Sequence, residues 1–182
     1  MSTFGDLLYD LSQYLRTTPA LDLADRIAAT SLSQSISSNF WAVPALQVAH
    51  ILAIAAAFGS VLMINMRILR ISGVDRTMGD TVARFAPWIW WALLVLVISG
   101  LGMIIAEPTR ELLNAAFWIK MVLVISMIGV TLAFQARTVR LNVKDWEATH
   151  ARRTSVRLTS AAILLLWCAI IFAGRWIAYA PT

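Results

Sequence analysis

The chain has one cysteine and two histidines among its 182 residues. Because Cys168 has no second cysteine to pair with, an intrachain disulfide and any cysteine-rich zinc or iron–sulfur site are excluded. The sequence also lacks H-E-x-x-H, G-x-S-x-G and G-K-[ST], the signatures of zinc proteases, serine hydrolases and P-loop nucleotidases. These absences favour a protein that is not an enzyme.

Charged residues are scarce as well. They make up 14% of the chain, whereas 59% is hydrophobic, which is too apolar for a soluble domain of this size. Four stretches have the length and hydrophobicity to cross a bilayer, which takes about 20 apolar residues. They are residues 41–66, 86–106, 113–136 and 158–179. Since short connections make consecutive helices antiparallel neighbours, we predict an all-α, up-down four-helix membrane bundle over residues 40–182.

Residues 1–39 form a different kind of segment. Apolar side chains recur at helical spacing over residues 3–16, and Pro19 interrupts this pattern before a weaker amphipathic stretch at residues 21–36. We expect no signal peptide here, because the first residues are acidic and have no continuous apolar core. The two stretches either lie flat on the outer membrane surface or cap the bundle. Their few Lys and Arg residues favour a cap on the outer face.

The net charge of +5 is concentrated in two connections. Ten of the fifteen basic residues lie there: Arg67, Arg70, Arg76 and Arg84 in the first, and Arg137, Arg140, Lys144, Arg152, Arg153 and Arg157 in the second. The positive-inside rule places both connections in the cytoplasm, with the N- and C-termini on the periplasmic side of a bacterial inner membrane. Topology therefore explains the basic residues. We expect membrane lipid, and no nucleic acid, as their partner.

Small residues mark two surfaces for close helix packing. In the first spanning stretch they recur at steps of three and four, and in the second they lie in the outer half. They include Ala49, Ala53, Ala56 and Ser60 in the first, and Gly100 in the second. Membrane helices approach each other closely at such residues. A single chain needs only part of these surfaces, so we predict a homo-oligomer or a partner membrane subunit.

His50 is the candidate for chemistry. It is the one titratable group between Phe40 and Arg67, and an ionisable side chain at membrane depth has a partner or a task. Gln47, one turn earlier, is placed to share its polar pocket. Three roles remain open: a neutral imidazole that only satisfies its neighbours, a ligand for haem or a metal such as copper, and a proton relay. Haem held between two histidines would require His50 from two chains, or a different second ligand such as Met.

Three more charged residues are predicted in the same outer half of the bundle. Counting about 1.5 Å per helical residue places Lys120 and Arg175 within a few turns of the outer surface, with Glu107 in the outer connection. Together with His50 they form the predicted outer cluster. In the alternative interpretation, Lys120 and Arg175 only extend toward lipid phosphates.

Several short motifs carry a resemblance over most of residues 20–180. They are Trp41-x-x-Pro44 followed by His50, Asn65-Met66-Arg67-Ile68-Leu69, Phe117-x-x-Lys120, and Trp167 with Gly174-Arg175-Trp176-Ile177-Ala178-Tyr179. They resemble an uncharacterised bacterial family of four-helix membrane proteins, which usually has Asp at the position of Asn65. The architecture is also remotely similar to the copper-resistance D (CopD) family and to four-helix b-type cytochromes. That similarity implies copper or haem handling.

The sequence thus predicts an integral membrane protein that binds a metal or haem centre for electron transfer, or that is a small accessory subunit of a membrane complex. Two alternatives stay open. One is a proton or anion transporter or channel component that uses His50, Lys120 and Arg175. The other is a purely structural membrane subunit.

Overall fold

The computed structural model describes residues 4–72, 75, 78–139 and 150–176. Over these residues the chain is helical and has no strand, which confirms the all-α prediction. The helices are α1 (Phe4–Arg16), α2 (Pro19–Ala28), α3 (Ser31–Ser37), α4 (Ala42–Ile68), α5 (Met78–Ala106), α6 (Pro108–Leu112), α7 (Ala115–Val139) and α8 (His150–Trp176).

Three of these helices are long and apolar enough to cross a membrane. They are α4 over Ala42–Ile68, α5 over Gly79–Ala106 and α8 over Val156–Trp176. By the same measure of length and composition, α7 contains a shorter apolar stretch, Ala115–Thr131. A membrane protein with three spans is therefore supported. The fourth span and the closed four-helix bundle stay predictions.

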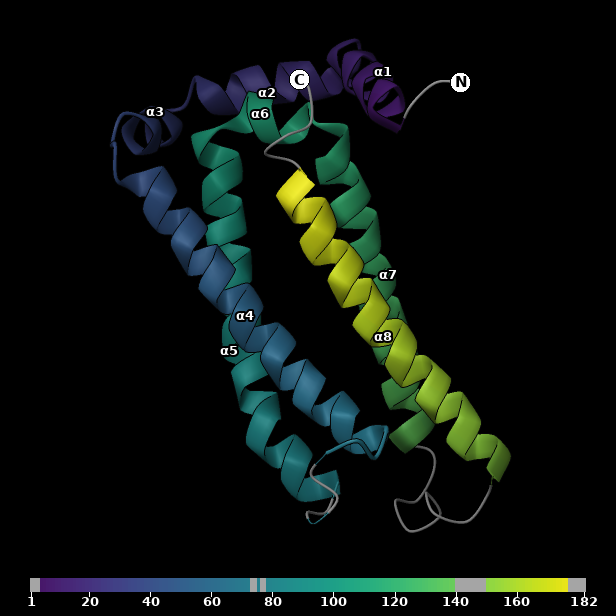
Figure 1. Cartoon of the computed structure of the whole chain (residues 1–182). Helices are drawn as coiled ribbons and strands as arrows, with labels where there is room; N and C mark the ends of the chain where they lie inside the picture. The colour runs from purple at the N-terminus through teal and green to yellow at the C-terminus, as the bar shows by residue number, and fades with distance from the viewer. Residues whose placement is uncertain (1–3, 73–74, 76–77, 140–149, 177–182) are drawn as a thin grey trace.

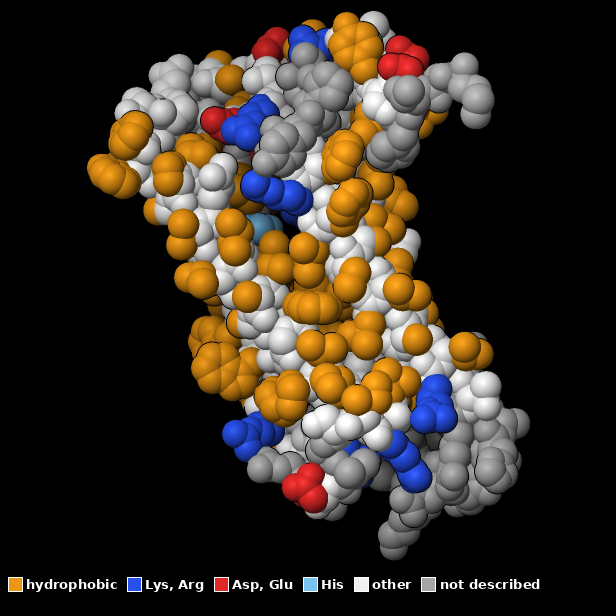
Figure 2. Space-filling model, in the orientation of Figure 1, with side chains coloured by type: hydrophobic (Ala, Val, Ile, Leu, Met, Phe, Trp, Pro, Cys, Tyr) orange, Lys and Arg blue, Asp and Glu red, His pale blue; other side chains and the backbone are white. Residues whose placement is uncertain are grey.

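The long helices form two pairs (Figure 1). Helix α4 packs along α5, α7 packs along α8, and the contact between α4 and α8 connects the pairs. Helices α1, α2 and α3 lie across one end of the long helices, and α6 lies beneath them. On the face in Figure 2, hydrophobic side chains cover the middle, and charged side chains gather toward the two ends. This distribution suits a protein whose middle lies in lipid.

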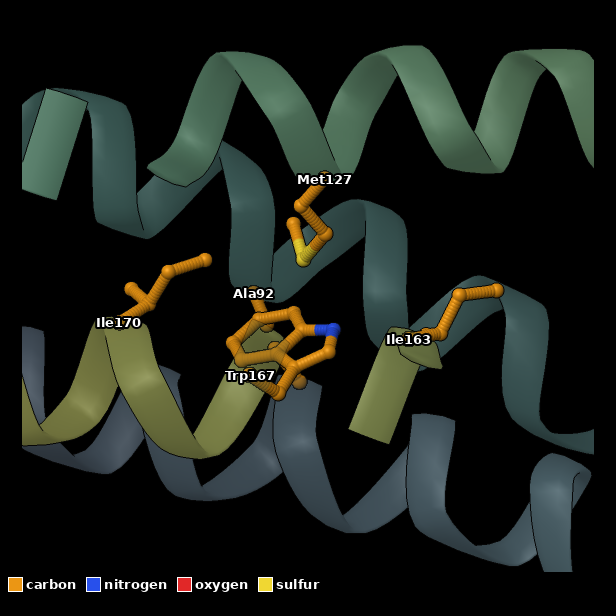
Figure 3. Close-up of a cluster of buried hydrophobic side chains, with 6 residues drawn as sticks. Ala92, Met127, Ile163, Trp167 and Ile170 are labelled. Carbon is orange, nitrogen blue, oxygen red and sulfur yellow. The ribbon is translucent and has the colours of Figure 1, made fainter. Parts of the chain in front are cut away.

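One hydrophobic cluster holds the two pairs together at mid-length (Figure 3). Trp167 of α8 lies among Ala92 of α5, Met127 of α7 and the fully buried Ala57 of α4. Alanines at the α4 and α5 positions leave room for the indole ring. The predicted small-residue ridge lies on this same helix α4. Ala53 and Ser60 are buried, and Ala49 and Ala56 are half-buried.

The N-terminal segment divides into three helices, one more than the sequence predicts. Pro19 separates α1 from α2 as expected, but residues 21–36 do not form one stretch, because α2 ends at Ala28 and α3 begins at Ser31. Thr30 explains the break. Its Oγ1 accepts a hydrogen bond from Ser33 N–H at 3.3 Å and thereby caps α3. Hydroxyl side chains that bond to nearby backbone favour such helix starts over helix interiors.

Helix α1 is attached to α7 through a buried serine. Ser12 Oγ donates to the Leu8 carbonyl at 2.8 Å and accepts from Ala115 N–H at 3.1 Å, and Asn114 Oδ1 accepts from Ala116 N–H at 2.9 Å. These bonds satisfy backbone donors that the first turn of α7 leaves without intrahelical partners. The N-terminal segment thus caps the long helices through specific contacts. Its depth relative to the membrane stays a prediction.

A buried polar pair joins α4 and α8 at the opposite end. Ser160 Oγ donates to Asn65 Oδ1, and Asn65 Nδ2 donates to the Val61 carbonyl at 2.7 Å. Nearby, Arg157 Nη2 donates to the Leu69 carbonyl at 3.2 Å, beyond the end of α4. Asn65 is therefore a packing residue that connects two helices.

Replacing Ser160 with Ala should destabilise the protein by about 1 kcal/mol, because the buried Asn65 oxygen loses its donor. The unfolding midpoint in detergent measures this loss. Ser126→Ala is the matched control, since Ser126 is exposed and its Oγ donates only to the Val122 carbonyl of its own helix, at 2.7 Å. Equal midpoints for the two variants would show that the α4–α8 pair contributes nothing.

Candidate functional site

His50 bonds to the neighbouring helix through one ring nitrogen. Its Nδ1 lies 2.8 Å from Ser99 Oγ of α5, and Ser99 Oγ donates to the Val95 carbonyl at 2.6 Å. A hydroxyl has one hydrogen, and the Val95 carbonyl receives it, so the Ser99 oxygen accepts from Nδ1–H. The hydrogen bonds therefore assign the proton to Nδ1, and Nε2 carries a lone pair.

Ser99 is the polar partner of His50, a role that the sequence assigned to Gln47. The Gln47 side chain is exposed and has no hydrogen bond among the described residues, whereas Ser99 is buried and faces His50. The two residues that bond are 49 positions apart, on different helices. No pattern within the first spanning stretch indicates that pairing.

Glycines let α5 approach His50 closely. A Cβ at Gly100 would lie 3.6 Å from His50 Cε1, in ordinary contact, so this glycine lies beside the ring. Two residues later, a Cβ at Gly102 would lie 2.9 Å from Leu46 Cδ2, so a side chain there would require the end of the Leu46 side chain to shift. Gly100 thus borders the site, and Gly102 lies against Leu46 of α4.

The second ring nitrogen of His50 remains reachable. Nε2 has no hydrogen-bond partner among the described residues. Every fully buried side-chain nitrogen or oxygen in those residues does have such a partner. Nε2 is therefore not sealed inside the protein. Figure 2 shows this face hollowed between α4 and α8 toward the α1–α3 end, with basic side chains and a histidine side chain at the hollow.

Lys120 of α7 approaches the same region from the other helix pair. A Cβ at Gly174 of α8 would lie 3.7 Å from Lys120 Nζ, so the amine lies beside bare backbone. Lys120 is close enough for its charge to act on both His50 and Glu111. Within the described ranges it forms no hydrogen bond and no ion pair of its own. The structure thus brings His50 and Lys120 of the predicted outer cluster to one end.

The other two predicted members lie differently. Glu107 Oε2 pairs with Arg110 Nη1 at 2.6 Å on the surface, and its side chain is 37% exposed. Arg175 is exposed and has interactions of its own. The acid whose charge interacts with Lys120 is Glu111, which sequence reasoning missed. The sequence feature that could have indicated Glu111 is the apolar pair Leu112-Leu113 directly after it, which is buried in the structure.

Glu111 is half-buried in α6, outside the candidate spans. Burial raises the pKa of its carboxyl above the ordinary value, and the nearby Glu107 adds to that rise. The positive charges of Lys120 and Arg110 act in the opposite direction. Since burial is the largest effect, folding favours the protonated form of this carboxyl.

A bare metal ion finds few ligands at this site. The described residues contain no group of three or more His, Cys, Asp and Glu side chains that could hold one, and Cys168 is exposed on α8. His50 offers one lone pair, and the charge that acts on it is that of Lys120, a cation. A ligand for this site must therefore bring most of its own coordination or hydrogen-bonding groups.

The family comparison agrees with the sequence motifs. Residues 26–180 match the Family of unknown function (DUF6644). The chain belongs to this family. The match includes His50, Ser99, Glu111 and Lys120, and it confirms the predicted resemblance to an uncharacterised family. No curated protein and no solved structure matches the chain. The remote similarity to copper-resistance D stays a prediction.

Stability should depend on pH through Glu111. A carboxyl with a raised pKa in the folded state stabilises the fold below its unfolded pKa, about 4.3, and this contribution is lost as pH rises through the folded value. Glu111→Gln should therefore match the wild type near pH 4 and unfold at a higher temperature than the wild type near pH 8. Thermal unfolding in detergent across this range measures the difference.

Asp25→Asn, which removes an exposed carboxylate from α2, controls for the change in net charge. If the wild type and Glu111→Gln keep the same difference in midpoint from pH 4 to pH 8, the carboxyl does not titrate with folding.

Proposed function

We propose that the protein is a membrane protein that binds haem through Nε2 of His50, for electron transfer within the membrane. The observation that carries the proposal is the hydrogen bond from His50 Nδ1–H to Ser99. Histidine ligands commonly donate the other ring N–H to an oxygen acceptor, which orients the ring and makes Nε2 more basic. Ser99 itself is held by its bond to the Val95 carbonyl.

The surroundings of His50 favour haem over a bare copper ion. A porphyrin supplies four nitrogen ligands to its iron, so one protein nitrogen per chain suffices, whereas copper needs several protein ligands. The described residues contain no group of three or more His, Cys, Asp and Glu side chains that could hold a copper ion. The cationic Lys120 opposes a free metal cation but suits a cofactor that carries carboxylates.

The interior beyond His50 argues against a transport path. From His50 toward the other end, α4 has no titratable residue before Arg67, and Asn65 is engaged with Ser160. Between these points the helices meet in the apolar cluster around Trp167. None of the described side chains of this cluster is titratable, so the cluster itself offers no proton-carrying or anion-binding group. A site that opens at one end favours ligand binding over transport across the membrane.

Purified protein reconstituted with ferric haem tests the proposal. We expect a Soret band with stoichiometric haem in the wild type, no specific binding in His50→Gln, and about tenfold weaker binding in Ser99→Ala, which removes the acceptor for Nδ1–H. Gln47→Ala, an exposed change on the same helix, should bind as the wild type does. The absence of a Soret band in the wild type, or full binding by His50→Gln, would refute haem ligation.

The haem-to-chain ratio also tests the predicted self-association. A ratio near one half indicates that two copies share one iron through two His50 side chains. A ratio near one indicates that each chain binds its own haem.

The orientation proposed from the basic residues can be measured in intact cells. In a Cys168→Ala background, Ser38→Cys lies in the link between α3 and α4, and Asp75→Cys lies between α4 and α5. We expect a membrane-impermeant thiol reagent to label position 38 and to spare position 75 until the cells are lysed. Labelling of position 75 in intact cells would reverse the proposed topology.

A further inference from the structure

We infer that Lys120 Nζ, beside the bare backbone of Gly174, is a subsite for a carboxylate of the ligand that His50 binds. This inference rests on the proposed haem function and adds the group that orients the cofactor. It concerns three residues on three helices: His50 on α4, Lys120 on α7 and Gly174 on α8.

Helix α7 itself does not stabilise a lysine at position 120. Lys120 lies in the second turn of α7, which begins at Ala115. A helix N-terminus carries partial positive charge, so a cation there gains nothing from its own helix. The side chain is also half-buried, and a buried charge is costly without a counterion. Lys120 is therefore placed for an anion that comes from elsewhere.

The chain does not supply that anion by direct contact. Glu111 is near enough for its charge to act on Lys120, yet no ion pair joins the two residues in the part of the chain that the structure describes. Burial raises the pKa of Glu111, which makes this carboxyl a weaker counterion. The Lys120 amine thus keeps its donors for another acceptor.

Gly174 leaves space beside that amine. A Cβ at this position would lie 3.7 Å from Nζ and 3.7 Å from Cε of Lys120. At Gly59 and Gly129, by contrast, a Cβ would meet nothing within 4 Å. Of these three glycines, Gly174 is therefore the one at which a side chain would contact a cationic group. A larger residue there would cover the amine.

Carboxylate is the group that fits these features. An ammonium offers up to three donors and binds an anionic oxygen by charge-assisted hydrogen bonds. Haem carries two propionate carboxylates on one edge of its ring. With Nε2 of His50 facing the iron and Lys120 receiving a propionate, the site would bind the cofactor in one orientation.

The test compares ferric haem with its dimethyl ester, which has the same iron and ring but no carboxylate. We expect the wild type to bind haem at least about tenfold more tightly than the diester, as loss of a charge-assisted hydrogen bond predicts. Lys120→Met should remove this preference and keep the diester affinity. Lys120→Arg should retain the preference, because it keeps the charge.

Gly174→Leu should also reduce the preference, by covering the amine. Gly129→Leu is the matched control, since Gly129 lies on α7 in open space. Equal affinities of the wild type for the two ligands, or an unchanged preference in Lys120→Met, would overturn the subsite while haem binding stands. Binding of neither ligand by the wild type would overturn the proposed function and the subsite with it.

Discussion

Close packing of α4 against α5 is the constraint on which the rest of the site depends. Gly102 lies against Leu46 of α4, and Gly100 lies beside the His50 ring. At that separation Ser99 reaches His50, and its bond to Val95 decides which ring nitrogen carries the proton. One helix contact thus sets both the position of the imidazole and the chemistry that its free nitrogen offers.

Two sets of interacting polar side chains lie at opposite ends of the long helices. The charge of Lys120 acts on both His50 and Glu111 at the end covered by α1–α3, and Asn65 pairs with Ser160 at the other. The cluster around Trp167 separates them. Polar groups in apolar surroundings are stable when they are paired, and an apolar interior breaks any continuous path between two such sets. The arrangement is that of a site open at one end.

Much of this was predictable from local composition. The apolar stretches located α4, α5 and α8, because a helix that faces lipid must be apolar over its whole length. Pro19 located the first break near the N-terminus, but the second break escaped notice, because a single hydroxyl at Thr30 caps α3. His50 was identified because an ionisable group is rare at that depth. Gln47 was assigned to the site because it lies one turn before His50, and Glu107 because it lies in the outer connection. In the structure Gln47 is exposed, and Glu107 pairs with Arg110 on the surface.

The sequence by itself determined the class of protein, three of the four predicted spans and His50 as the residue of interest, because each follows from the cost of placing polar groups in lipid. Only the tertiary structure decided what His50 and Lys120 face. Ser99 and Gly174 come from helices far along the chain, and they meet those side chains through the packing of α4 on α5 and of α7 on α8. Contacts of that kind depend on how helices are rotated and separated, and the hydrophobicity of each stretch leaves both undetermined.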